Sequence, residues 1–403
     1  MDKPTFMEFW LTPKSTSYED GYGVGDQLRS LGIAEHAHRI SAFSNEDFSH
    51  RLSVFLADNS RMLARLEETD EVARLDEVGQ IGVKSDAAPG HVYPHSRLEH
   101  SRLGVSYIAV HCSRMGLHYS DSTKRSAAMM LHDLGHSALS HQAERALQLA
   151  GHGDHEDRGQ HILRGSPGLQ AVLMQDGRVY PNDLLPIMSE KGVEGVAQSI
   201  FDSLSWVVMD SAMAGRPLPE DFEWRVISSI VREDWDGLVV DDHVPLQELL
   251  ERRVELFPKI YVSLRGRVSN ASVHEVVRLM LRQKKIVPNH LMQGIDNQVL
   301  PRIQGYLING APEYIKSAWQ LGQGYVDESD RWELETFSNE SDFRTRVVAL
   351  STDDVPHLAS NVYPFWKKAI PVKTTAGARL RLQAEAKDYS GLERLYFILV
   401  FKG

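Results

Sequence analysis

Two residues of the types that bind metal ions, His132 and Asp133, stand side by side at the end of an apolar helical stretch. The stretch starts near Ser126, has the composition of a fully buried helix and breaks at Gly135. A helix over 103–115, with apolar residues at helical spacing, precedes it. The pattern therefore predicts a helical core in which the His-Asp pair follows a buried helix.

Further candidate ligands for the same metal lie upstream and downstream of this pair. His100 precedes it, and Asp202 follows it in a long helical stretch. Two imidazoles and two carboxylates suit a hard or borderline divalent cation, and Mn, Fe, Ni, Zn and Mg all fit that description. A cation with open coordination positions makes a nucleophile from water at neutral pH. The set predicts a metal-dependent hydrolase, whereas a lone histidine such as His100 is more often a core or surface residue.

The helix predicted over 193–214 carries three informative side chains on one face. Asp202, Trp206 and Asp210 are spaced at i, i+4 and i+8. Asp202 could reach a metal, and Trp206 and Asp210 would then line an adjacent pocket for a ring or a sugar hydroxyl. The alternative is an ordinary amphipathic helix with Trp206 in the core and both carboxylates in solvent.

Other charged and titratable side chains near the pair suit phosphate chemistry. Arg97 lies three residues before His100 on the same helix face and could hold a phosphate, or it is a surface charge at a helix start. His136, His141 and His155 follow the pair, and histidine has the unperturbed pKa that suits proton transfer near neutrality. One of them could act as general acid or base or neutralise phosphate oxygens, although some of the 18 histidines must be bystanders.

The composition limits the class of protein and of partner. The chain has 403 residues, 42% hydrophobic and 25% charged, which is ordinary for a globular protein. Its formal net charge of -11 argues against a broad DNA- or RNA-binding surface, but not against a local basic pocket. Cys112 is the only cysteine, so an intrachain disulfide is excluded and a reducing compartment is indicated. Without a signal peptide or an apolar run long enough for a membrane helix, the sequence predicts a cytoplasmic protein with no membrane contact.

The order of elements predicts a mainly α fold. A helical leader is expected over 1–70, a catalytic core over 71–285 and a helical extension over 286–350. A stretch that alternates with period two and a later β-prone run predict a small α+β region over 351–403.

Taken together, these motifs resemble the HD-domain phosphohydrolases. The residues that carry the resemblance are Arg97–Ser101, His132–His141, His155-Glu156 and Asp202. The combination R-x-E-H-S with H-D-x-G-H-x-x-x-S-H is far more specific than a bare His-Asp dipeptide, and it is most similar to the branch of deoxynucleoside triphosphate triphosphohydrolases. The resemblance covers about half of the chain, residues 74–280.

The resemblance implies an all-helical core that holds one divalent metal ion. The implied metal ligands are His100, His132, Asp133 and Asp202. The implied residues around the scissile phosphate, which include the proton-transfer groups, are His136, His141 and His155.

Substrate-binding residues and an assembly state are implied as well. Arg97 would contact substrate phosphate, while Asp210 and Gln80 would bind the sugar. Arg267, on a looser alignment, falls where a phosphate-binding arginine is expected. Trp206 stands at the position of a residue that stacks on the sugar. Hexamers and tetramers are common in this branch, so a homo-oligomer is expected.

The chain departs from that branch in the helix that carries Asp202. The branch has D-K-x-D-Y where this chain has Asp202-Ser203-Leu204-Ser205-Trp206, so Ser203 replaces a phosphate-binding lysine and Trp206 a tyrosine. Ser269 stands where a further tyrosine is expected. The metal ligands are intact, so these changes bear on substrate recognition rather than on hydrolysis.

Three functions are consistent with these features. The leading hypothesis is hydrolysis of a nucleotide phosphate ester, specifically a dNTP to deoxynucleoside and triphosphate. The second is a hydrolase of nucleoside monophosphates or cyclic nucleotides on the same core. The third is a nucleotide-sensing or nucleic-acid-binding regulator, although the overall acidity argues against nucleic acid. Its partner surface would be the basic C-terminal residues Lys367, Lys368, Lys373, Arg379 and Arg381.

Overall fold

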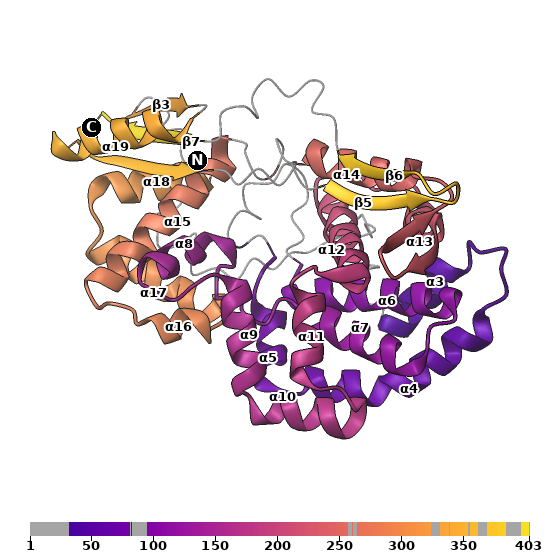
Figure 1. Ribbon diagram of the computed structural model, residues 1–403. Coiled ribbons are helices and arrows are strands. Elements are labelled where there is room, and N and C mark those ends of the chain that lie inside the picture. Colours follow the sequence, from indigo (N-terminus) through magenta and orange to yellow (C-terminus); the bar gives the residue numbers. More distant parts are fainter. Residues whose placement is uncertain are drawn as a thin grey trace, which may run out of the picture.

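The computed structural model describes residues 32–80, 82, 95–256, 260, 264–323, 331–337, 339–353, 355–361, 369–383 and 396–402. The described chain is mainly helical, with small sheets to which its C-terminal part contributes most strands, so the predicted fold class is confirmed. Figure 1 shows two groups of helices that lie side by side. No described helix combines the length and the apolar composition needed to cross a membrane.

The larger group of helices surrounds a hydrophobic core that we call the first core. Helix α6 is buried around almost its whole circumference, and Gly104 allows it to approach α7, because a Cβ there would lie 2.5 Å from the sulfur of Met129. The helices of this group are α3 (Ile33–Ser41), α4 (Ser49–Glu67), α5 (Asp70–Ala73), η1 (Arg74–Glu77), α6 (Arg97–Met115), α7 (Tyr119–Leu131), α9 (His155–Gly165), α10 (Pro167–Val172), η3 (Leu173–Gly177), α11 (Pro181–Met188), α12 (Gly192–Met213), α13 (Phe222–Ser229) and α14 (Val244–Leu256).

The smaller group surrounds the second core. Two tryptophans, Trp319 and Trp332, are buried in it, and Trp319 is the more deeply buried of the two. The helices are α8 (His141–Leu149), α15 (Leu264–Arg282), α16 (Pro288–Met292), α17 (Asp296–Asn309) and α18 (Glu313–Gln323). A further helix, α19 (Glu340–Thr352), packs beside this group against the C-terminal strands.

Two sheets flank the cores. The first has the order β1-β2-β5-β6, in which β5 runs parallel to β2 and the other neighbours are antiparallel. The second has the order β3-β7-β4 and is antiparallel throughout. The strands are β1 (Ile230–Asp234), β2 (Gly237–Val240), β3 (Trp332–Phe337), β4 (His357–Asn361), β5 (Ala369–Thr374), β6 (Arg379–Gln383) and β7 (Tyr396–Phe401).

The C-terminal strands are divided between the two cores. β5 and β6 extend the β1–β2 hairpin, and their apolar side chains join the first core, whereas β7 pairs with β3 and β4 beside the second core. The strand β3 lies inside the 286–350 segment, for which the sequence predicted helices. Of the basic C-terminal residues, Lys373 and Arg379 form ion pairs with Asp236, and Lys367 and Lys368 lie outside the described residues. The predicted domain boundaries stay predictions.

The segment that follows α7 passes from one core to the other. Leu134 is buried in the first core, whereas Ala138 and Leu139 are buried in the second. The segment ends at α8, which packs on α15 (Figure 1). A site built on the His-Asp motif therefore lies where the two cores meet.

Candidate active site

The start of α6 fixes the positions of Arg97 and His100. The Ser96 hydroxyl accepts a hydrogen bond from the Glu99 backbone N–H at 3.0 Å, and the Glu99 carboxylate accepts one from the Ser96 N–H at 2.7 Å. This reciprocal cap satisfies two N–H groups that a helix start leaves open. Because the helix begins at Arg97, both side chains project from its first turn and on one face.

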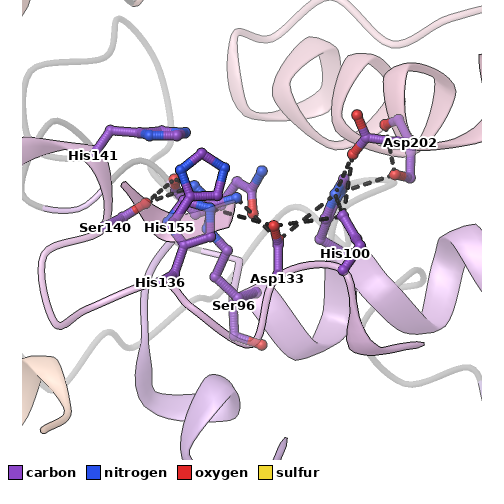
Figure 2. Close-up of polar contacts among 12 residues, drawn as sticks. Ser96, His100, Asp133, His136, Ser140, His141, His155 and Asp202 are labelled. Carbon is purple, nitrogen blue, oxygen red and sulfur yellow. Dashed lines mark hydrogen bonds and ion pairs between the residues drawn. The ribbon is translucent and has the colours of Figure 1, made fainter. Parts of the chain in front are cut away.

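Three of the four predicted metal ligands, His100, His132 and Asp202, bring ligand atoms within 4.8 Å of one another where α6, the end of α7 and α12 meet. The fourth, Asp133, lies beside them, with Oδ2 3.9 Å from Nε2 of His100 (Figure 2). The Nε2 atom of His100 lies 2.9 Å from Asp202 Oδ1 and 3.3 Å from Nε2 of His132. The Nε2 atom of His132 lies 3.3 Å from Asp202 Oδ1 and 3.5 Å from Asp133 Oδ1. Neighbouring ligand atoms around one ion at about 2.1 Å stand about 3 Å apart, so His100, His132 and Asp202 fit a single divalent cation, with Asp133 beside it.

Hydrogen bonds behind the two imidazoles turn their Nε2 lone pairs toward the centre of the group. Nδ1 of His132 donates to the Met129 carbonyl at 2.7 Å. Nδ1 of His100 lies 2.9 Å from the Ser205 hydroxyl, which in turn donates to the Asp202 carbonyl at 2.8 Å. Such contacts fix the tautomer and orientation of metal-binding histidines. Ser205 stands where the resembling branch has aspartate. Its hydroxyl contact with Nδ1 orients the ring of His100.

The charges in this group keep both carboxylates ionised. Burial raises the pKa of Asp202, but hydrogen bonds from His100 and His132 outweigh it and hold that pKa well below its usual value. Burial also raises the pKa of Asp133, and the positive charge of Arg97 with the neighbouring histidines reverses the effect. For His132, burial lowers the pKa, but the two carboxylates raise it to about 9. The site therefore attracts positive charge to its centre, as a cation site requires.

Asp133 also joins the metal ligands to a second group of polar side chains. Its Oδ2 atom accepts a hydrogen bond from Arg97 at 3.0 Å, and its Oδ1 atom lies 3.3 Å from Nε2 of His136. Arg97 further donates to the Gln80 carbonyl at 3.0 Å and to the Ser140 hydroxyl at 2.5 Å. Arg97 is 4% exposed, so the alternative of a surface charge is wrong.

The three predicted histidines form one cluster around Glu144. Nδ1 of His141 and Nδ1 of His155 each lie 2.8 Å from the Glu144 carboxylate, which also accepts the His155 backbone N–H at 2.8 Å. The ring of His136 stacks on that of His155 with centroids 4.1 Å apart, and His141 lies edge-on to both (Figure 2). Glu144 thus fixes the Nδ1 side of both rings and orients them.

Ring geometry favours an anion over a second metal ion at this cluster. The three rings offer nitrogen atoms within 4.8 Å of one another. An imidazole lone pair lies in the ring plane, however, and the planes of His136 and His155 differ by only 20°, so their lone pairs run side by side instead of converging. Burial, together with the charge of Arg97, lowers the pKa of His136. A neutral imidazole beside a buried guanidinium suits phosphate binding and proton transfer.

The remaining predicted substrate residues surround this centre to different degrees. Asp210 is fully buried, with Oδ1 3.3 Å from Nε2 of His95, so a carboxylate in solvent is wrong at this position. Trp206 is half-buried, and the Arg253 guanidinium lies over its ring at 5.0 Å. Gln80 is buried, and its side-chain oxygen has no hydrogen-bond partner among the described residues. Arg267 is half-buried in α15, which packs on α8.

Sequence reasoning missed several residues of this region. Glu144 stands three residues after His141 on the same helix face, and that spacing is the signal that could have found it. Arg253 donates to the Ser203 hydroxyl at 2.6 Å and lies over Trp206, so a cation from α14 stands behind the segment that lacks the expected lysine. No local pattern links α14 to α12, because the two helices meet only in the folded chain.

The turn between Ser137 and His141 is strained. Leu139 and Ser140 are not glycines, yet both have positive φ, 64° and 51°. Each such residue costs about 1–3 kcal/mol and persists only where surrounding contacts enforce it. The Ser140 hydroxyl lies 3.2 Å from the Gln80 carbonyl and accepts from Arg97, so the strained turn is part of the polar network.

The first core holds His155 against the His-Asp motif through a contact between two glycines. Gly135 lies so close to α9 that a Cβ at this position would be 1.8 Å from the His155 carbonyl oxygen and 2.4 Å from the Gly159 nitrogen. Only hydrogen at this position permits such an approach of two backbones. The distance between the metal ligands and the histidine cluster thus depends on Gly135.

The fold of this chain is similar to those of solved structures. It is similar to a phosphohydrolase from Bacteroides thetaiotaomicron, with a TM-score of 0.57 and 15% identity over 83% of this chain and 94% of that one. It is also similar to a hypothetical protein from Aquifex aeolicus, with a TM-score of 0.59 and 18% identity over 84% of this chain and 92% of that one. At these identities the likeness is one of fold.

A similarity in sequence adds one curated relative. The uncharacterized protein YwfO of Bacillus subtilis is 27% identical over 208 residues, which are 48% of this chain and 46% of YwfO. The chain therefore spans about half the length of the curated relative it matches. No family model matches the chain.

Proposed function

We propose that the protein is a metal-dependent phosphohydrolase that acts on a nucleotide phosphate ester. The observation that carries this proposal is that His100, His132 and Asp202 bring ligand atoms within 4.8 Å of one another, with Asp133 beside them. Asp133 and Arg97 join this group to the histidine cluster. A fold shared with a phosphohydrolase supports the same reaction class.

His100, His132 and Asp202, together with the neighbouring Asp133, would hold one divalent ion, with Mn, Fe, Ni, Zn and Mg as candidates. When bound, such an ion polarises a phosphoryl oxygen and lowers the pKa of a water molecule. The hydrogen bonds to Met129 and Ser205 orient the two imidazoles for this purpose. The donor set, two nitrogens and two ionised oxygens, fits those metals.

The side chains next to the ligands would bind the phosphate and move protons. Arg97 carries a fixed positive charge that offsets the negative charge developing on a phosphate, usually a large contribution to such reactions. His141, the most exposed of the three histidines at 42%, accepts or donates a proton at Nε2 while Glu144 holds its Nδ1. His136 and His155 present nitrogen atoms to the same phosphate.

The specific form of the proposal is hydrolysis of a dNTP to deoxynucleoside and triphosphate, by a homo-oligomer. Gln80, Trp206 and Asp210 would bind the sugar, and Arg267 would bind phosphate, as the sequence resemblance implies. The buried side-chain oxygen of Gln80, which has no partner among the described residues, supports a ligand contact there. Arg253 also supports dNTP binding, because its guanidinium places a positive charge over the Trp206 ring.

A monophosphate or cyclic nucleotide is the second candidate substrate, and Ser203 favours it. Ser203 stands where a phosphate-binding lysine is expected, and its buried hydroxyl is engaged by Arg253 and by the Ser199 carbonyl. A substrate with one phosphate needs fewer cations than one with three.

The test is a turnover panel in Mn²⁺ with the four dNTPs, NTPs, monophosphates and cyclic nucleotides, resolved by anion exchange. Tripolyphosphate with deoxynucleoside is the expected product. Inorganic phosphate from monophosphates, or a linear product from cyclic nucleotides, would select the second candidate. A protein that retains its metal but turns over none of them contradicts the enzyme proposal and favours a nucleotide sensor. Mass measurement in solution tests the oligomer.

A further inference from the structure

One side chain from the second core holds two segments of the candidate site at once. Asp296, the first residue of α17, accepts a hydrogen bond from the Gly79 backbone N–H at 3.0 Å through Oδ2. It accepts another from the Leu139 backbone N–H at 2.7 Å through Oδ1. The two donors are 60 residues apart in sequence, and the acceptor lies in a helix that Figure 1 shows beside α15 and α16.

The two segments carry several of the site's polar groups. Gly79 precedes Gln80, whose carbonyl accepts from Arg97, and Leu139 precedes Ser140 and the first residue of α8, His141. The hydroxyl of Ser140 lies within 3.2 Å of the Gln80 carbonyl, so the segments also touch directly. Moving either segment would displace an acceptor of Arg97.

The strained turn needs an external restraint of this kind. Leu139 has a φ of 64°, a conformation that a leucine adopts only when its surroundings enforce it. The Asp296 carboxylate binds the N–H of that same residue, and a hydrogen bond to a charged acceptor is stronger than one to a neutral acceptor. The contact is tight on the other side as well, because a Cβ at Gly79 would lie 3.3 Å from Asp296 Oδ2.

We propose that Asp296 is a positioning residue, which holds the Gly79–Gln80 segment and the Leu139–Ser140 turn in register and thereby couples the second core to the geometry of the site. The carboxylate is required because it offers two acceptor oxygens, one for each N–H, whereas a carboxamide offers one oxygen and opposes the second N–H with its own donor. The inference rests on the proposed function only for its kinetic readout.

The experiment compares wild type with Asp296→Asn, using hydrogen exchange of peptides that cover 76–82 and 137–142, the content of bound Mn²⁺, and kcat and KM for the substrate that the panel selects. We expect faster exchange in at least one of the two peptides and a 10- to 100-fold loss of kcat/KM, the size of a lost hydrogen bond to a charged group. Bound Mn²⁺ is expected to stay at the wild-type level, because no metal ligand touches Asp296 among the contacts of the described residues.

Asn297→Ala is the matched control. Asn297 is exposed, lies next to Asp296 and reaches Glu77 at 3.4 Å, so the variant tests removal of a neighbouring contact from the same helix start. It is expected to leave exchange in both peptides, metal content and kinetics unchanged. Asp296→Asn with wild-type exchange in both peptides would overturn the proposal, as would equal effects of the two variants.

Asp296→Glu covers the case in which the asparagine variant does not fold. Glutamate keeps two acceptor oxygens but sets them about 1.5 Å further from the backbone, so both hydrogen bonds cannot keep their lengths. Faster exchange in these two peptides, with unchanged exchange in α6, supports the proposal, and wild-type exchange in both refutes it. If no substrate is found in the panel, the exchange and metal measurements still decide the role of Asp296, independently of the proposed function.

Discussion

Replacing Gly135 with alanine should damage the site without removing any functional group. The new Cβ would lie 1.8 Å from the His155 carbonyl oxygen, 2.4 Å from the Gly159 nitrogen and 2.8 Å from the His155 carbonyl carbon. Ordinary van der Waals contact begins near 3.4 Å, so the start of α9 must retreat by about 1.6 Å. All three contacts are with backbone atoms, which cannot be relieved by a change of rotamer.

Two magnitudes follow for Gly135→Ala. Overpacking a core costs about 1–3 kcal/mol when side chains can adjust, so a clash between backbones should cost about 3 kcal/mol or more of unfolding free energy. The retreat carries His155 away from His136 and Glu144, and a displacement of about 1 Å in such a site can cost about 100-fold in rate. We therefore expect a lower denaturation midpoint and a loss of about 100-fold in kcat/KM.

The control for this substitution lies in α9, the helix whose start Gly135 contacts. Gly165 ends α9, and a Cβ there meets no atom within 4 Å, so Gly165→Ala should leave activity unchanged and stability equal or slightly higher. Chemical denaturation and turnover of both variants are the measurements. A Gly135→Ala protein as stable and as active as Gly165→Ala would refute the reasoning, because it would mean that the start of α9 can move away from residue 135 at little cost in free energy.

Three other substitutions test separate parts of the structure. Asp133→Ala should lose bound metal, measured by elemental analysis, and fall to background turnover; wild-type turnover would contradict the metal proposal. Glu144→Gln should retain metal but lose about 10- to 100-fold in kcat, because the Nδ1 side of His141 loses its charged partner; an unchanged pH–rate profile would argue against proton transfer there. Glu233→Gln tests acid stability: hydrogen bonds from His111 and Arg125 outweigh burial and lower the pKa of Glu233 to about 2. A carboxylate whose pKa is depressed in the folded state stabilises the protein above about pH 4.5, and this stabilisation is lost as the pH falls toward 2. Over that interval the wild type should therefore lose about 3 kcal/mol more unfolding free energy than the variant in denaturation experiments. Equal losses in the two proteins would contradict this prediction.

The helices and the grouping of His100, His132 and Asp202 were predictable because their signals are local or chemically specific. The helix expected over 193–214 is α12, Gly192–Met213, and the buried stretch before His132 is the end of α7. The pattern R-x-E-H-S with a helix cap at Ser96 fixes Arg97 and His100 together. The type of a side chain and its spacing within one helix can be read directly from the sequence, and these predictions used only that information.

The remaining features depend on contacts between distant segments. β1 and β2 are too short to give a clear period, and β3 lies in a segment that also contains helical patterns. Arg253 and Asp296 have no motif of their own, since each acts through a partner in another element. The positive φ of Leu139 could not be predicted from the sequence, because leucine rarely adopts that conformation.

The parallel pairing of β2 with β5 has a consequence for synthesis of the chain. Val239 lies opposite Lys373, so the free edge of the β1–β2 hairpin has no partner until the ribosome has added the residues between them. At about 5–20 residues per second, those roughly 130 residues take about 7–26 s to make. During that time a strand with three buried residues, Leu238, Val239 and Val240, presents unpaired backbone groups to other nascent chains. Overproduction should therefore yield aggregates that a chaperone able to hold partly folded chains would reduce.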